Sequence, residues 1–403
     1  MTPEEALVEA EQAVAAALRK LGWPELPLDR SPQHGDLAVI CFPVAKQLRK
    51  PPEALAKELA SALVVRGLRA NALKGYCNVA LDWRPLAPEL LVQMATGDFG
   101  RGAPTGHRVL IEHTSANATG PFHMGRARNP VIGDTLARLL RYNGDEVATE
   151  YYVNDMGRQA ATLAYGVRHF APGDAEKVDH ALVECYRQAN AALESDPAAK
   201  EAIYALMERC EQGDTEAVAE VAGAAEKMLA GMRVSLARLG AETGAFFHES
   251  QLVTGGAVGK VIEALVESSL CGDEEGAKYL DLTDYGIAGR NQKFFFTRKS
   301  GLSLYTTRDV AYHLSKFSRC DIAINVLGED HKLQSQLLSI ALGELDAPAP
   351  EAVFYAFVSL PGGKMSTRAG RVVYLDDMLD ELQIDRVDFI KMDIEGAERQ
   401  ALE

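Results

Sequence analysis

The stretch that decides the fold is Arg108–Arg141, which reads RVLIEHTSANATGPFHMGRARNPVIGDTLARLLR. It opens on the apolar run Val109–Ile111, the composition of a buried parallel strand. Residues 114–121 are rich in Ser, Thr, Asn, Gly and Pro, which indicates a loop. From Arg128 apolar residues recur at helical spacing as far as Asn143, where the pattern ends at a following glycine. The sequence therefore predicts a strand, a loop and a helix in succession.

Such a loop can hold a phosphate, because the free N–H groups of a helix start point toward it and Gly125 lets the backbone come close. The residue sequence of this loop is more specific than its strand–loop–helix arrangement. Glu112–Asn117 (EHTSAN) and Thr119–Gly125 (TGPFHMG) resemble the nucleotide-binding signature of class I aminoacyl-tRNA synthetases, and within that class the arginyl family. A second block, Gly362–Gly370 (GGKMSTRAG), is similar to the mobile Lys-Met-Ser loop of the same family.

Length, composition, cysteine content and net charge limit the class of protein. The 403 residues are enough for two or three domains, and 47% hydrophobic with 25% charged residues is ordinary for a soluble protein. We expect no membrane span, because no apolar run approaches the ~18–20 residues that one needs. The six scattered cysteines argue against a zinc cluster or a disulfide framework and favour a reducing cytoplasm. The net charge of −15 argues against a generally basic RNA-coating protein, but a tRNA enzyme needs only local basic patches.

The resemblance implies an α/β fold: a Rossmann-like parallel sheet with a helical insertion, preceded by a small N-terminal α/β domain. We expect a tRNA-contact domain over 1–100, a catalytic domain over 101–380 with its insertion at about 160–240, and an atypical tail over 381–403. Strands are predicted in the catalytic domain at Glu146–Asn154, Phe294–Thr297, Asp321–Leu327 and Ala352–Leu360.

The N-terminal domain is predicted to open with a helix that reaches about Lys20. An apolar strand within Asp29–Val44, one helix over Lys46–Arg66 and a strand at Asn78–Leu81 follow. The piece HGDLAVICFPVAKQLRKPPEALAKELA resembles the family domain that contacts the tRNA elbow. Its basic residues could meet phosphates, but residue by residue a solvated helix face is the better interpretation; they are Lys46, Arg49, Lys50 and Arg66.

The end of the chain departs from the family. We expect the helical anticodon-binding domain to be missing, since only Leu375–Glu403 follows the catalytic stretch. Within that segment Ile384–Glu398 (IDRVDFIKMDIEGAE) is similar to one motif of FkbM-type S-adenosylmethionine methyltransferases. No glycine-rich cofactor loop precedes it, so we interpret the tail as a fused remnant without that activity. An ordinary acidic strand and helix is the alternative.

Adenylate formation brings a carboxylate oxygen onto the α-phosphorus of ATP, so it depends on positioning and charge neutralisation. By resemblance the catalytic residues are His123, Arg126, Lys364 and Arg368. The same resemblance gives a nucleotide set of Ala116, Asn117, Pro121, His123, Gly125, Arg126, Gly328, Asp330, His331, Lys364, Met365 and Ser366. Mg²⁺ would bridge the phosphates with few protein ligands, so no protein metal site is expected.

A guanidinium carries five donors and stays charged, so its pocket needs carboxylates or carbonyls. The resemblance implies an arginine site made of Glu112, Asn117, His123, Tyr305 and Asp309. Asp309 is placed at the guanidinium end, although alone it could be only a helix N-cap. His331 could likewise be a satisfied polar residue at a strand end.

Three positions depart from the family pattern. Arg126 stands where the family usually has its second histidine, and Thr367 where it has the second lysine of Lys-Met-Ser-Lys. Arg368 could supply the missing positive charge. Gly120 occupies the place of a compensating lysine found in some members. We therefore expect activation to depend jointly on Lys364, Arg126 and Arg368.

The sequence thus predicts a monomeric arginine–tRNA ligase that uses ATP and Mg²⁺ on L-arginine and tRNA(Arg). Three alternatives stay open. The chain could be a truncated fragment that binds arginine, ATP or tRNA without turnover. It could form an adenylate with another amino acid, or, more remotely, be a methyltransferase.

Overall fold

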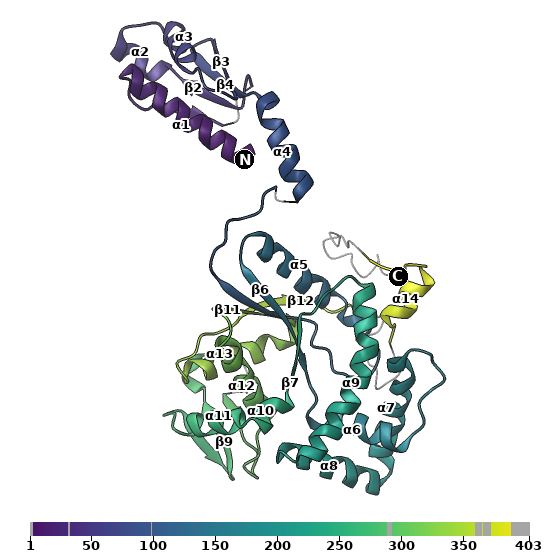
Figure 1. Ribbon diagram of the computed structural model, residues 1–403. Coiled ribbons are helices and arrows are strands. Elements are labelled where there is room, and N and C mark those ends of the chain that lie inside the picture. The colour runs from purple at the N-terminus through teal and green to yellow at the C-terminus, as the bar shows by residue number, and fades with distance from the viewer. Residues whose placement is uncertain are drawn as a thin grey trace. The chain divides into compact units, whose positions relative to one another are not determined.

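The computed structural model describes residues 3–30, 33–97, 99–287, 292–358, 365 and 372–387. The chain divides into two compact units, Met1–Gly102 and Ala103–Glu403, each with its own core (Figure 1). Along the described residues, no helix is both long and apolar enough to span a bilayer.

The N-terminal unit packs its helices against a four-stranded antiparallel sheet of order β1-β2-β4-β3. Alternate residues of β2 and β4 are buried with the apolar faces of α1 and α3, which makes a core around Leu37, Val39 and Leu59. The elements are α1 Pro3–Leu21, β1 Leu28–Asp29, β2 Leu37–Ile40, α2 Phe42–Leu48, α3 Pro52–Ala62, β3 Leu68–Leu73, β4 Tyr76–Leu81 and α4 Trp83–Thr96.

The single helix predicted over Lys46–Arg66 is wrong. The chain forms two helices, α2 and α3, because Pro51 and Pro52 lack the N–H groups that a continuous helix needs. Arg49 takes a left-handed φ of 52° at the break. The basic residues therefore do not share one helix face, and Lys50 forms a 2.5 Å ion pair with Glu58.

The C-terminal unit is built on a five-stranded parallel sheet of order β12-β11-β5-β6-β7, which confirms the predicted fold class. Its strands are β5 Arg108–Glu112, β6 Glu146–Val153, β7 Ala245–His248, β11 Ile322–Gly328 and β12 Glu351–Tyr355. The apolar run of β5 lies at the centre of the sheet, paired in parallel with both β6 and β11.

Helices cover both faces of this sheet. Val109 and Ile111 of β5 pack with Ala137 of α5 (Arg128–Tyr142) on one face. Leu110 faces the opposite way and packs near Phe317, the last residue of α12 (Tyr305–Phe317). This burial of both faces explains why β5 is a continuous apolar run in the sequence rather than an alternating one.

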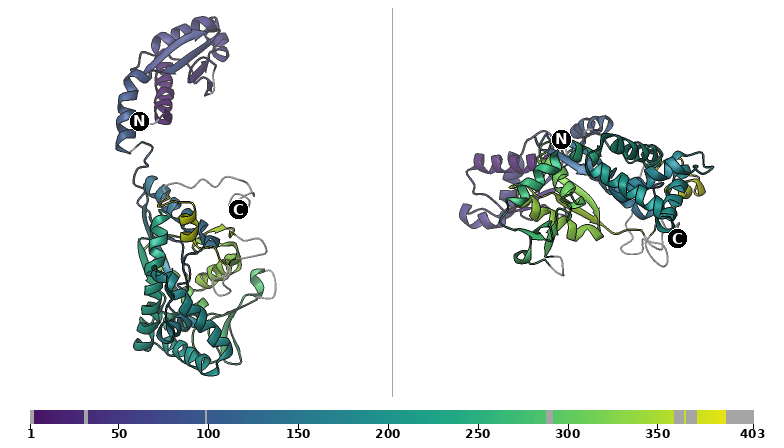
Figure 2. Two further views of the ribbon diagram at one scale, coloured as in Figure 1. Left: turned by 90° about the vertical axis from the view of Figure 1, so that its right-hand side faces the viewer. Right: turned by 90° about the horizontal axis from the view of Figure 1, so that it is seen from below.

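A group of four helices stands between β6 and β7, where the sequence predicts a helical insertion. They are α6 Gly157–His169, α7 Val178–Ser195, α8 Pro197–Glu211 and α9 Thr215–Arg238. Asp196 and Asp214 cap α8 and α9 by accepting bonds from backbone N–H groups of the first helical turn. Figures 1 and 2 show these helices lying together, and Tyr151 and Val153 of β6 reach into their shared core.

Most of the remaining elements form a second layer around α12, while α14 packs with the helical insertion. They are α10 Ser250–Thr254, α11 Ala257–Val266, β8 Cys271–Glu274, β9 Ala277–Asp281, η2 Thr283–Tyr285, β10 Lys293–Phe295, η3 Glu329–His331, α13 Lys332–Gly343 and, nearer the C-terminus, α14 Leu375–Glu381. The strand predicted at Phe294–Thr297 corresponds to β10, which belongs to a separate antiparallel sheet of order β10-β9-β8.

Two mid-helix glycines should respond oppositely to alanine. A Cβ on Gly133 of α5 would lie 2.3 Å from Cβ and Cγ of the buried His113, so Gly133→Ala should destabilise the protein by about 3 kcal/mol. Gly223 of α9 has nothing within 4 Å, so Gly223→Ala should stabilise it by about 0.5–1 kcal/mol. Urea unfolding checks both, and equal effects would contradict the close helix–strand contact.

Candidate active site

The loop after β5 has a strained backbone that its surroundings hold in place. Thr114 and Ser115 adopt positive φ values of 71° and 35°, which are costly for residues with side chains. The Thr114 N–H donates to Asn129 Oδ1 at 2.6 Å, and Ser115 Oγ donates to Glu112 Oε1 at 2.9 Å. The Tyr151 hydroxyl donates to the carbonyl of Ala116 at 2.5 Å. These bonds fix the backbone that presents the following polar residues.

Gly125 explains the His-x-Gly spacing at the start of η1 (Met124–Arg126). A Cβ on Gly125 would lie 2.9 Å from His123 Nδ1, so only glycine leaves room for the imidazole. Described residues on either side of the 359–371 segment contact this motif. The Val358 N–H donates to the Gly125 carbonyl at 3.3 Å, and the Met124 N–H donates to the Val373 carbonyl at 2.9 Å. We call residues 372–375, which follow the segment, the strap.

A cleft of about 340 Å³, the central cleft, opens above this motif. It brings together six of the predicted nucleotide residues: Ala116, Asn117, Pro121, His123, Arg126 and Met365. The other lining residues are Thr119, Gly120, Phe122, Gln159, Tyr186 and Met232. Asn117 is oriented by donating its amide N–H to Gln159 Oε1 at 2.8 Å.

The side chains of His123 and Arg126 both have nitrogen atoms without a hydrogen-bond partner among the described residues. Burial, and secondarily the Arg126 charge, lowers the pKa of His123 to about 4, so the imidazole is neutral at pH 7. Its Nδ1 is buried without a hydrogen-bond partner among the described residues. The Arg126 guanidinium likewise makes no hydrogen bond or ion pair to the described part of the chain. A buried polar atom without a partner is costly, so the pair is suited to an anionic ligand.

A second cleft of about 470 Å³ adjoins the first and shares Asn117 and Gln159 with it. Tyr305 lines this second cleft, beside Arg298 and Arg308. Both guanidiniums are neutralised by carboxylates, Arg298 by Glu211 at 2.9 Å and Arg308 by the buried Glu249. Arg158 also lines this cleft, and its guanidinium makes no hydrogen bond or ion pair to the described part of the chain, so the lining residues that can recognise a polar ligand are Arg158, the tyrosines Tyr204 and Tyr305, and the amides.

Asp309 is not a helix N-cap, so that alternative is wrong. It is the fifth residue of α12, whose N-cap is Leu304. Its carboxylate is 44% exposed and lies 3.2 Å from His313 Nδ1. Glu112 is nearly buried at the end of β5, where its Oε2 accepts a 2.5 Å bond from Lys316. Asp309, unlike Asn117, lines neither cleft.

The predicted adenosine-side residues lie at the carboxyl end of β11. Gly328 is buried, and a Cβ there would lie 2.3 Å from the Phe357 ring. Asp330 and His331 belong to η3 and are about half exposed, with 3.8 Å between Asp330 Oδ1 and His331 Nε2. They share the carboxyl edge of the parallel sheet with Glu112 but do not line the central cleft. Lys364, Ser366 and Arg368 lie outside the described residues.

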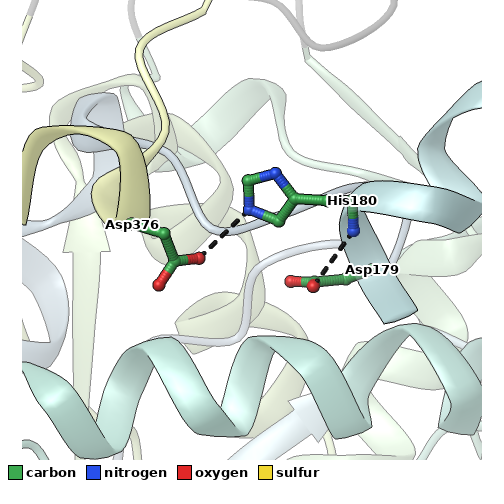
Figure 3. A group of neighbouring side chains, drawn as sticks. All are labelled: Asp179, His180 and Asp376. Carbon is green, nitrogen blue, oxygen red and sulfur yellow. Dashed lines mark hydrogen bonds and ion pairs between the residues drawn. The ribbon is translucent and has the colours of Figure 1, made fainter. Parts of the chain in front are cut away.

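One cluster has the spacing of a metal site, and Figure 3 shows it: Asp179 and His180 at the start of α7 and Asp376 of α14. Lys177 Nζ already lies between the carboxylates, 2.6 Å from Asp376 Oδ2 and 3.0 Å from Asp179 Oδ2. Burial alone would raise the pKa of Asp376, but hydrogen bonds from His180, Lys177 and Ser235 outweigh it and hold the pKa well below its usual range. The cluster is therefore an ion-pair network, which we call the α14 latch.

Sequence reasoning missed the residues that support the site. Tyr186 comes from α7 of the helical insertion, where no motif marks it. Lys316, His313 and Asn325 are buried behind Glu112. One signal was available for this group, because Asn325 is an isolated polar residue inside the apolar strand Asp321–Leu327, which usually marks a buried hydrogen bond.

Comparison with known proteins agrees with this arrangement. A family model described as tRNA synthetases class I (R), catalytic domain, matches residues 88–395, and one described as arginyl tRNA synthetase N terminal domain matches residues 9–81. The arginine–tRNA ligase of Methanocaldococcus jannaschii is 41% identical over 371 residues, covering 89% of this chain and 65% of that protein. That of Methanocella arvoryzae is 42% identical over 390 residues, covering 93% and 68%.

The arginyl-tRNA synthetase structure from Thermus thermophilus matches with a TM-score of 0.62 at 26% identity, covering 98% of this chain and 73% of that chain. The chain thus spans about two thirds of the length of the curated relatives that it matches. The resemblance carried by the two sequence blocks is confirmed. The chain therefore belongs to the arginyl-tRNA synthetase family, within the class I tRNA synthetases.

Proposed function

We propose that this chain activates L-arginine with ATP and transfers the arginyl group to tRNA(Arg). Relatives named arginine–tRNA ligase support the substrates, and class I synthetases use ATP in this reaction. The observation that carries the proposal is the central cleft, which is lined both by His123, whose imidazole still has an unpartnered nitrogen, and by Arg126, whose guanidinium is unpaired within the described structure.

The chemistry joins an arginine carboxylate oxygen to the α-phosphorus of ATP, and the bond to pyrophosphate breaks. No enzyme nucleophile is needed, so the protein's part is positioning and charge balance. Neutral His123 would donate to a phosphate oxygen, and Arg126 would offset the charge on the leaving group. Lys364 and Arg368 would act from the stretch between Val358 and Val373, two residues that bond to the His123–Gly125 motif.

The amino acid would lie between the two clefts. Asn117 lines both clefts and His123 lines the central one, so these two can contact the carboxylate end, and Glu112, which lines neither cleft, would receive the ammonium from the end of β5. Tyr305 and Asp309 would receive the guanidinium, with Asp309 forming the charge-assisted pair.

Mg²⁺ is proposed as the cation that neutralises the phosphates when ATP binds. The described residues lining the central cleft include no carboxylate, which fits an ion held mainly by phosphate oxygens and water. We also propose that the protein is a monomer, and that the N-terminal unit and the helices α6–α9 contact the tRNA.

ATP–pyrophosphate exchange with L-arginine, measured with and without tRNA(Arg), tests the function. Reactions lacking amino acid give the background, and circular dichroism confirms that the protein is folded. Exchange that requires arginine would support the proposal, and exchange only with tRNA would add that this chain engages tRNA by itself. No exchange under either condition from folded protein would overturn it in favour of a fragment that binds without turnover.

A further inference from the structure

A lysine is completely buried behind the proposed arginine site. The Lys316 side chain has no exposed surface, and a buried ammonium is costly unless each of its three N–H groups finds an acceptor. Its Nζ lies 2.5 Å from Glu112 Oε2, 2.6 Å from Asn325 Oδ1 and 3.3 Å from His313 Nε2. The ring of Tyr312 lies against it, with its centroid 4.3 Å from Nζ. The ammonium is therefore fully satisfied.

The hydrogen bonds of this group admit one tautomer of His313. Its Nδ1 lies 2.9 Å from the Asp309 carbonyl oxygen, which can only accept, so Nδ1 carries the proton. Its Nε2 must then accept, which it does from Asn325 Nδ2 at 2.7 Å and from Lys316. The same Nδ1 also lies 3.2 Å from Asp309 Oδ1, although its hydrogen bond goes to the carbonyl. The network thus runs without interruption from Glu112 through Lys316 and His313 to Asp309.

Glu112 is fixed from both sides. Oε2 accepts from Lys316, and Oε1 accepts from Ser115 Oγ at 2.9 Å, a hydroxyl that itself accepts from the Tyr152 N–H at 3.1 Å. Asn325 stands directly beside Glu112 in the register of β11 and β5. Each carboxylate oxygen keeps a free lone pair, so Glu112 can still receive a ligand N–H without rotating.

We propose that Lys316 and His313 are positioning residues that hold the carboxylates of Glu112 and Asp309 ready for the two cationic ends of arginine. The inference rests on the proposed function, because it takes the arginine site to be where that proposal puts it. Fixing both carboxylates before the substrate arrives removes an ordering cost from binding, so the network should act on arginine and not on ATP. A role in folding alone would lower stability and leave both apparent affinities unchanged.

The test compares Lys316→Met with Lys260→Met, an exposed lysine of α11. Lys316→Met should raise the arginine KM in exchange, and the arginine Kd by calorimetry, by about 10- to 100-fold, the range typical of lost supporting bonds. The ATP KM should stay within twofold, and Lys260→Met should match the parent chain. An unchanged arginine Kd in folded Lys316→Met, or equal rises for arginine and ATP, would overturn the inference.

Lys316→Met leaves Glu112 without its ion pair and could fail to fold, so His313→Leu provides a second variant. It removes the imidazole that lies 3.2 Å from the Asp309 carboxylate and keeps the pairs of Lys316 with Glu112 and Asn325, so a rise of about 10-fold in arginine Kd is expected. No change there would also overturn the inference. Calorimetry separates the two proposals. If the parent protein binds arginine but shows no exchange, the proposed function is contradicted. The arginine Kd values of the variants can still be compared with that of the parent, so the role of the network is still decided.

Discussion

Asp309→Asn should reduce kcat/KM for arginine activation by about 10²- to 10³-fold. The change keeps the shape of the side chain but removes the charge that would pair with the guanidinium, and losing one partner of such a pair costs about 3–4 kcal/mol. Because Asp309 is 44% exposed, the protein should keep its fold and its apparent affinity for ATP. ATP–pyrophosphate exchange over a range of arginine concentrations measures the effect.

The matched control is Asp284→Asn, an exposed aspartate of η2 that should behave like the parent chain. ATP–pyrophosphate exchange is also measured for the parent and for Asp309→Asn with other amino acids in place of arginine. A variant that loses arginine and keeps another amino acid would show that the chain activates that other one. Activity within threefold of the parent would show that a different residue recognises the guanidinium.

Asp376→Ala should detach α14, at a cost of about 3–5 kcal/mol in local stability, because a buried carboxylate is removed from two cations and a hydrogen-bonded histidine. Those partners, Lys177, His180 and Arg238, lie on α7, α9 and the segment before α7, so the latch fastens α14 to the helical insertion. Hydrogen exchange should speed up about 100-fold or more in 372–387, including the strap that pairs with His123 and Met124.

Asp377→Ala is the control, since this neighbouring carboxylate is exposed and its removal should cost less than about 1 kcal/mol. The pH dependence follows from the depressed pKa of Asp376. Its stabilisation is fully present above about pH 4, the unfolded pKa of an aspartate, and is lost as pH falls further. The difference between parent and variant should thus be constant from pH 7 to 5. Protection of α14 that is unchanged in Asp376→Ala would contradict the latch.

The parts of the fold that the sequence predicted correctly depend on local pattern. The run Val109–Ile111 and the helical repeat after Arg128 appear as β5 and α5, because burial on both faces of a strand and on one face of a helix leaves a mark in consecutive residues. Asp196-Pro197 and Gly213-Asp214, where α7, α8 and α9 are separated, carry a local signal of the same kind, since caps and prolines act locally.

The parts that the sequence did not reveal depend on distant partners. Lys316 meets Glu112 across 204 residues, and in the sequence it is only one more polar position on an amphipathic helix. Asp376 meets Lys177 from 199 residues away. The division of Lys46–Arg66 is different, because Pro51 and Pro52 mark the break locally, and the helical spacing of Leu55 and Leu59 belongs to α3 alone. The roles of His123, Arg126 and Asp309 remain predictions that the experiments above decide.

The central position of β5 also has a consequence for biosynthesis. One edge of this strand pairs with β6, which follows within about forty residues. The other edge pairs with β11, which comes much later in the chain: Asp321, the partner of Arg108, lies 213 residues further on. At about 5–20 residues per second, a ribosome needs roughly 10–40 s to make that interval. For that time the middle of the sheet has an apolar strand with an open edge, the kind of template on which chains aggregate. The main hazard in making this protein therefore falls during translation, before its last two parallel strands exist.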